Sequence, residues 1–213
     1  MSTISPPSPL SEISLVAPPS RLSADDNGII LTAEQFDSIE EFDDEFNYEL
    51  IHGVVIVTPF ASLAERDPNE ELGRLLRNYQ DKHPGVLDKT VFEQYVRTPD
   101  TRRRADRVIW AGLGRTPDFQ KDVPTIIVEF VSPSRRDQLR DYVFKRDEYL
   151  AVGVKEYWVI DRFRRTMTVF HSASSPDSPT VIAENDTYRP ALLPGFELPL
   201  KALLKVADDW KQS

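Results

Sequence analysis

The 213-residue sequence contains no cysteine. It therefore has no disulfide, no thiolate metal site and no cysteine nucleophile, and this composition fits the reducing cytoplasm. Its three histidines, His52, His83 and His171, are scattered and lack the spacing of a zinc site. These absences leave hard oxygen ligands as the natural choice for any metal chemistry, and we expect a cytoplasmic protein.

Long apolar runs are also missing. No stretch approaches the roughly 20 apolar residues that a membrane-spanning helix needs. The N-terminus has neither a basic start nor an apolar core of the kind found in signal peptides. We therefore expect no membrane partner.

Basic residues are absent from one long region. Between Leu22 and Glu65 there is no Lys or Arg, and the net charge of the chain is −9. Such a charge argues against binding of nucleic acid by the surface as a whole. Arginines and lysines gather instead in three clusters: Arg97, Arg102, Arg103, Arg104 and Arg107; Arg135, Arg136, Arg140, Lys145 and Arg146; and Arg162, Arg164 and Arg165. Each cluster is either a local phosphate contact or an ordinary solvated surface.

The chain length predicts one domain. Residues 1–27 are rich in Ser and Pro and are typical of a disordered tail, which leaves 28–213 as the folded domain. Periodicity and turn signals predict helices over 32–39, 69–82, 134–152 and 200–210, and strands over 29–31, 86–97, 106–110, 125–131, 154–161, 166–171 and near 181 and 188. Residues 48–58 predict two strands joined by a turn at His52 and Gly53, and 59–68 and 99–104 predict a loop and a basic turn. Ser134 and Asp137 fit a capping box at the start of the third helix. This order predicts an α/β (α+β) fold with a central mixed β-sheet flanked by helices.

One acid stands inside the most apolar of these strands. Glu129 lies in the run I-I-V-E-F-V, which is bounded by Pro124 and Pro133. An ionised carboxylate in such a strand is costly unless a cation compensates its charge. A metal ion, a buried ion pair or a position open to water would each explain Glu129.

Two further residues could join it. Asp106 begins the preceding strand, and Lys145 lies on the helix that follows. If the two strands are neighbours, their carboxylates could hold Mg²⁺ or Mn²⁺ together with substrate phosphate. The alternatives are a strand-end Asp106 paired with an Arg such as Arg104, and a solvated Lys145 whose stem covers apolar surface.

The segments I-I-V-E-F-V-S-P-S (126–134) and F-K-R-D-E-Y-L-A-V-G-V-K-E-Y-W-V-I-D (144–161) closely resemble the Uma2 family of restriction-endonuclease-like proteins, within the PD-(D/E)XK nuclease superfamily. Shorter matches are Y-E-L-I-H-G (48–53), R-A-D-R-V (104–108) and L-L-P-G-F-E-L (192–198). The resemblance covers about 29–204. It implies a restriction-endonuclease-like core and a metal-dependent phosphodiesterase site.

The resemblance also implies roles for particular residues. Asp106 and Glu129 would be the two metal-binding acids, and the Phe130 carbonyl a further ligand. The superfamily's lysine usually stands two residues after the second acid, where this chain has Val131, so Lys145 would supply the ammonium from the next helix.

Three acids are further candidates for the site. Superfamily members often add a Glu from an early helix, a role open to Glu70 or Glu71; Glu49 is another candidate. The alternative for Glu70 or Glu71 is a first-turn Glu favoured by the helix dipole, and the alternative for Glu49 is a surface strand residue. Many relatives carry a His near the start of that helix, where this chain has Pro68 and Asn69.

These observations lead to two hypotheses. The first is a Mg²⁺- or Mn²⁺-dependent endonuclease that hydrolyses DNA by direct water attack, in which Asp106, Glu129 and Lys145 are catalytic. Arg102, Arg103, Arg104, Arg135 and Arg136 would contact DNA phosphates, and a homodimer is an option by analogy with restriction enzymes. The second is a catalytically inactive nuclease fold that binds DNA or protein. A third option is an enzyme that acts on RNA or a nucleotide.

Overall fold

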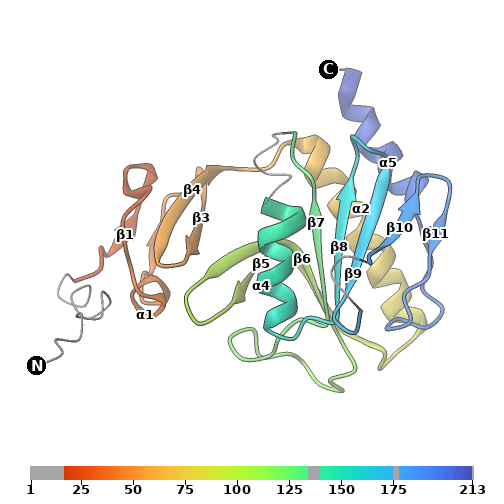
Figure 1. Cartoon of the computed structure of the whole chain (residues 1–213), viewed down its shortest axis with the longest axis horizontal. Helices are drawn as coiled ribbons and strands as arrows, with labels where there is room; N and C mark the ends of the chain where they lie inside the picture. Colours follow the sequence, from red (N-terminus) through yellow and green to blue (C-terminus); the bar gives the residue numbers. More distant parts are fainter. Residues whose placement is uncertain (1–16, 134–139, 175–177, 213) are drawn as a thin grey trace, which may run out of the picture. The chain divides into compact units, whose positions relative to one another are not determined.

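The computed structural model describes residues 17–133, 140–174 and 178–212 (Figure 1). The chain divides into two compact units. The first comprises the described residues up to Phe60 together with Arg97–Arg103, and the second comprises Ala61–Val96 and the described residues from Arg104 onward.

The first unit is built on a hairpin. It contains β1 (Arg21–Leu22), η2 (Ala24–Asp26), α1 (Ala33–Asp37), β2 (Glu41–Phe42), β3 (Phe46–Ile51) and β4 (Val54–Pro59). The predicted turn at His52 and Gly53 is confirmed, and both residues have positive φ, as a tight hairpin turn requires. The predicted helix start at Thr32 is confirmed by a capping box with Gln35.

The predicted tail is wrong for the part of it that the structure describes as folded. Leu22 is fully buried, and β1 pairs in parallel with β2. The Ser- and Pro-rich composition of this region predicts a tail, but Leu22 is an apolar residue within it that is buried. Residues 1–16 of the predicted tail lie outside the described residues.

A mixed sheet forms the centre of the second unit. Its strands are β5 (Leu87–Arg97), β6 (Arg102–Ala111), β7 (Ile126–Phe130), β8 (Glu156–Asp161), β9 (Thr166–His171) and β10 (Thr180–Ala183). The order is β10-β9-β8-β7-β6, and β5 also pairs with β6. Strands β7 and β8 are parallel, whereas β6–β7, β8–β9 and β9–β10 are antiparallel. A small hairpin of β11 (Thr187–Tyr188) and β12 (Leu198–Pro199) completes the strands of this unit.

Helices cover both faces of this sheet, which confirms the predicted fold class (Figure 1). On one face lie α2 (Leu63–Lys82) and α5 (Leu200–Asp208), which η4 (Asp209–Gln212) extends. On the other lie η3 (Arg140–Phe144), a π-helical turn, and α4 (Lys145–Ala151). Alternate β7 residues serve the two cores, so Ile126 and Val128 face α2 and α5 while Ile127 faces α4. This alternation directs Glu129 toward α4.

Two predicted boundaries are wrong. Helix α2 begins at Leu63 rather than Asn69, because Ser62 and Glu65 form a capping box before it and Pro68 is accommodated inside the helix. The predicted basic turn through Arg104 is strand from Arg102 onward.

The predicted helix over 134–152 is confirmed in its described part, from Arg140 to Ala151. Its predicted capping box at Ser134 and Asp137 lies outside the described residues. Among the helices that the structure describes, none combines the length and apolar character needed to cross a membrane.

Candidate active site

The two predicted acids lie where β6 and β7 separate. The ladder between these strands ends at the pair Arg107 and Val128, and Asp106 and Glu129 are the next residues along the same register. Beyond the ladder, the Phe130 amide donates to Asp106 Oδ2 at 2.6 Å. The Asp106 carboxylate thus takes the place of a backbone carbonyl as acceptor for the Phe130 amide. We call the point where β6 and β7 separate the fork, and both acids lie there.

Glu129 is bound from the facing helix. Its Oε2 accepts from Lys145 Nζ at 2.8 Å, and its Oε1 accepts from the Tyr149 hydroxyl at 3.1 Å. Glu129 is 2% exposed and Lys145 is 3% exposed. Because α4 begins at Lys145 and packs on this face, the predicted lysine does meet the second acid. The structure therefore places Lys145 beside Glu129, and its role as the lysine that is absent at Val131 stays a prediction.

Asp141 is a third buried acid, and it is not among the residues predicted from the sequence. It lies one helical turn before Lys145, and its Oδ1 is 3.5 Å from Lys145 Nζ. The Tyr157 hydroxyl donates to the Asp141 carbonyl at 2.9 Å and fixes this turn against the sheet. The four-residue spacing of Asp141 and Lys145 is a helical pairing signal that could have identified it.

The charges in this cluster do not balance. Asp106, Glu129 and Asp141 are three carboxylates, and two cations face them: the Lys145 ammonium group lies between Glu129 and Asp141, and Arg140 Nε is 3.3 Å from Asp141 Oδ1. Burial raises the pKa of Asp106 to about 6, although Lys145 and the Phe130 amide oppose the shift. Burial, reinforced by the charges of Asp106 and Asp141, also raises the pKa of Glu129, against the opposing effect of Lys145. The site therefore favours an additional positive charge.

This charge excess predicts how stability depends on pH without metal. The pKa of Asp106 is higher in the folded chain, at about 6, than its ordinary value of 3.8. The contribution of protonated Asp106 to the free energy of unfolding is therefore fully present below pH 3.8. It is lost as pH rises through 6, which lowers the free energy of unfolding by about 3 kcal/mol. Asp106→Asn should remove this loss, so the variant should gain free energy of unfolding relative to wild type between pH 4 and 7.

Urea denaturation in EDTA across that range measures the difference. Asp81→Asn, a change at an exposed position of α2, is the matched control and should follow wild type. If the free energy of unfolding changed with pH in the same way for Asp106→Asn and wild type, the raised pKa of Asp106 would be contradicted.

Helix α2 contributes an acid, but not one of those predicted. Glu71 pairs with Arg74 at 2.6 Å, and Glu70 is exposed. Glu65 is instead buried, and its charge adds to the raised pKa of Asp106. Its Oε2 caps the helix at Ser62, while its Oε1 is buried without a hydrogen-bond partner. The Ser62–Glu65 capping pattern could have identified it.

The third predicted candidate, Glu49, is buried on β3 in the first unit. Asp106 belongs to the second unit. The participation of Glu49 in the site stays a prediction.

A buried arginine fixes the backbone of Asp106. Arg107 donates from Nε to Asn69 Oδ1 and from Nη2 to the Asn69 carbonyl, each at 2.7 Å, and from Nη1 to Thr90 Oγ1 at 3.2 Å. Asn69 Nδ2 in turn donates to the Asp106 carbonyl at 2.8 Å. Burial lowers the pKa of Arg107 to about 10. Asn69 thus ties α2 to the strand that carries Asp106.

Gly73 makes room for this arginine. A Cβ at Gly73 would lie 2.6 Å from Arg107 Nη2 and 2.9 Å from its Cζ. Gly→Ala in a helix normally stabilises a protein by roughly 0.5–1 kcal/mol. Here the guanidinium is held by three hydrogen bonds and cannot move freely, so we expect Gly73→Ala to destabilise the fold by about 1–3 kcal/mol.

Thermal or urea unfolding measures this change. Asn78→Ala, at an exposed position of the same helix, should be neutral or slightly stabilising. Stabilisation by Gly73→Ala of the size seen for Asn78→Ala would show that Arg107 is not fixed there.

The predicted DNA-contacting arginines have different environments. Arg102 and Arg103 are buried in the first unit, where Arg102 pairs with Asp37 at 2.7 Å. Arg104 pairs with Glu93 at 2.6 Å. The remaining two, Arg135 and Arg136, lie outside the described residues. DNA contact by these five residues stays a prediction, and the burial of Arg102 and Arg103 argues against those two.

Comparison with known proteins agrees with this architecture. The Uma2 family, described as "Putative restriction endonuclease", matches residues 33–201. A crystal structure of a putative nuclease belonging to DUF820 from Anabaena variabilis ATCC 29413 superposes with a TM-score of 0.65 at 16% sequence identity, covering 83% of this chain and 99% of that chain. At this identity the likeness shows a shared fold. No curated protein matches the sequence. The chain belongs to the Uma2 family.

Proposed function

We propose that this protein is a Mg²⁺- or Mn²⁺-dependent endonuclease that hydrolyses DNA phosphodiester bonds by direct attack of water. One observation carries the proposal. Asp106 and Glu129 are buried together at the fork of β6 and β7, with more negative charge around them than Lys145 neutralises. A purely structural ion pair gains nothing from this excess, whereas a cation site requires it.

The donor set fits a hard divalent cation. The carboxylates of Asp106 and Glu129, together with the Phe130 carbonyl, would hold it. Within the described part of the chain, no group of three or more His, Asp or Glu side chains is placed to hold a metal ion. Mg²⁺ does not need one, since it commonly takes one or two carboxylates, several waters and a substrate phosphate. When bound, the ion would polarise the phosphoryl oxygen and lower the pKa of its water.

Two side chains of α4, Tyr149 and Lys145, have distinct tasks. Tyr149 orients the Glu129 carboxylate through its hydroxyl. Lys145, held by Glu129 at 2.8 Å and Asp141 at 3.5 Å, keeps an ammonium group beside the acids. We assign to Lys145 the orientation of the attacking water and the stabilisation of negative charge that develops on the phosphoryl oxygens.

Plasmid cleavage tests this function. We expect purified protein to nick or linearise supercoiled plasmid in Mg²⁺ or Mn²⁺ and to be inactive in EDTA. A preparation of Glu129→Gln, purified in parallel, controls for contaminating nucleases and should be inactive. Equal cleavage by both preparations would overturn the assignment.

One observation favours the second hypothesis, a nuclease fold without catalysis. Both Glu129 oxygens already accept hydrogen bonds, from Lys145 and Tyr149, so a metal must share or replace these contacts. Wild type that binds DNA but neither cleaves it nor takes up metal would favour this alternative. A homodimer and a cytoplasmic location stay predictions.

A further inference from the structure

The turn between β8 and β9 carries the third basic cluster, and its three arginines have different environments. Arg165 pairs with Glu184 at 2.5 Å and with Asp208 at 2.8 Å, so it ties the turn to neighbouring elements. The Arg164 side chain is 63% exposed. Arg162 differs from both, because its Nε is buried without a hydrogen-bond partner in the described part of the chain. The cluster is therefore not a uniform solvated surface.

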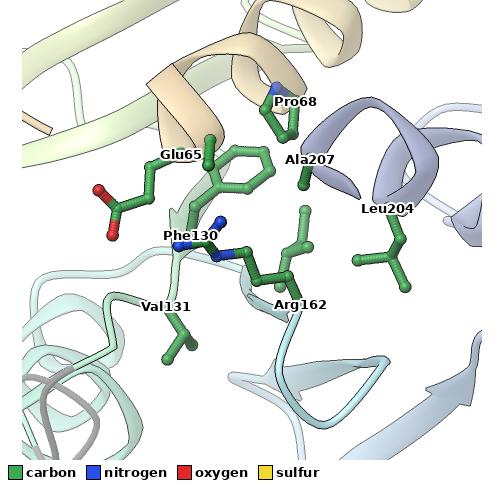
Figure 2. A pocket seen from close by; sticks show the side chains of 9 residues that line it. Glu65, Pro68, Phe130, Val131, Arg162, Leu204 and Ala207 are labelled. Carbon is green, nitrogen blue, oxygen red and sulfur yellow. The ribbon is translucent and has the colours of Figure 1, made fainter. Parts of the chain in front are cut away.

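Arg162 lines a small pocket on the side of the sheet that α2 and α5 cover (Figure 2). Figure 2 shows Glu65 reaching this pocket from α2 and Arg162 reaching it from the turn after β8. Apolar side chains, among them Phe130 and Leu204, supply most of the remaining lining. The pocket volume is about 10 Å³, close to the roughly 10–15 Å³ that a single water needs. The pocket therefore admits only a ligand of the size of water.

Two buried polar atoms at this pocket are chemically complementary. Arg162 Nε is a hydrogen-bond donor and Glu65 Oε1 is an acceptor, and each lacks a partner among the described residues. The Ser62 amide and hydroxyl hold the other Glu65 oxygen, Oε2, at 2.8 and 2.9 Å. The Arg162 guanidinium lies 4.7 Å from the centre of the Phe163 ring. These contacts fix both groups in positions where the donor and the acceptor do not bond to each other directly.

The charges of the two residues restrict what can satisfy them. Buried polar atoms are costly unless each finds a hydrogen-bond partner. Arg162 would repel an added cation, and Glu65 would repel an anion. A neutral molecule that accepts one hydrogen bond and donates another suits both atoms, and the pocket volume limits it to water. Internal waters have about two to four polar partners, and this pocket supplies two.

We propose that this pocket binds one internal water, which accepts a hydrogen bond from Arg162 Nε and donates one to Glu65 Oε1. The water completes a buried, water-mediated ion pair between the first turn of α2 and the turn after β8. Phe130 also lines the pocket, and its amide donates to Asp106 Oδ2. The water-mediated pair thus fastens α2 beside the strand end where the candidate acids lie. This inference does not rest on the proposed function, since it needs neither metal nor DNA.

A crystal structure of the full chain that resolves water molecules tests the site directly. We expect one water within hydrogen-bond distance, roughly 2.7–3.2 Å, of both Arg162 Nε and Glu65 Oε1. A direct hydrogen bond between Arg162 and Glu65, or a pocket in which no water contacts both atoms, would overturn the proposal.

Thermal unfolding tests whether the water couples the two side chains. Arg162→Met removes the donor and leaves the Glu65 charge buried, so we expect Tm to fall by about 4–8 °C. Glu65→Gln keeps the capping pattern with Ser62 and should lower Tm by about 2–4 °C. The double variant should lose clearly less than the sum of the two changes, because each single change leaves the other side chain unsatisfied.

Arg189→Met is the matched control. Arg189 is 64% exposed and pairs with Glu197, so its loss should change Tm by less than about 2 °C. Additive effects of the two changes, or Arg162→Met as stable as Arg189→Met, would overturn the water-mediated pair. The wild-type crystal structure keeps the proposal falsifiable if Arg162→Met does not fold. Neither measurement involves cleavage, so an inactive protein would contradict the proposed function and leave this inference standing.

Discussion

Asp106→Asn should reduce metal-dependent DNA cleavage by about a thousandfold or more while the protein stays folded. Asparagine keeps the size of the side chain and can still accept from the Phe130 amide through its oxygen. It removes the negative charge that a divalent cation needs at this position. Because burial already raises the pKa of Asp106 to about 6, the neutral side chain suits the metal-free fold.

Initial rates of plasmid nicking in saturating Mg²⁺ measure the loss, and urea denaturation verifies the fold. Asp81→Asn removes the same charge at an exposed position and should cleave as wild type does. If Asp106→Asn cleaved plasmid as fast as wild type, and EDTA did not reduce that rate, the fork of β6 and β7 would not be the active site.

Lys145→Met should cause the largest loss of stability at the site, about 3–5 kcal/mol at neutral pH. Methionine retains the length of the buried stem but leaves Glu129 without its cation and Asp141 with Arg140 alone. Cleavage should also disappear, since the ammonium group no longer stands beside the acids.

A double variant separates stability from catalysis. Glu129→Gln combined with Lys145→Met removes both charges of the pair and should recover much of the stability without restoring cleavage. Lys205→Met, at an exposed position of α5, controls for loss of a lysine and should change the free energy of unfolding little. If Lys145→Met proved as stable as Lys205→Met, the ion pair with Glu129 would not exist in solution.

Much of this arrangement is readable from the sequence because the signals are local. The apolar run at 126–130, the capping box at Thr32 and the turn at His52 and Gly53 each specify their own conformation. The resemblance predicts that Lys145 reaches the two acids from the next helix, and in the structure the Lys145 ammonium group donates to Glu129.

The features that were missed depend on tertiary context. Glu65 falls in the predicted loop over 59–68, yet capping at Ser62 starts α2 at Leu63, and Glu65 is buried. Arg102 and Arg103 looked like an exposed basic turn, and only strand pairing in the first unit shows that they are buried. No local pattern predicts that Asn69 links Arg107 to the Asp106 carbonyl, because Asn69 is distant in the chain from both residues.

The central claim is that the buried acids form a divalent-metal site, and calorimetric titration of Mn²⁺ at pH 8 tests it without depending on DNA. At that pH Asp106, with a pKa of about 6, is ionised. Wild type should bind Mn²⁺ with saturable heat, binding should weaken as pH falls toward 6 because the acids take up protons, and Asp106→Asn should show no saturable heat. Identical titrations for wild type and Asp106→Asn, or no binding to wild type, would contradict the metal site.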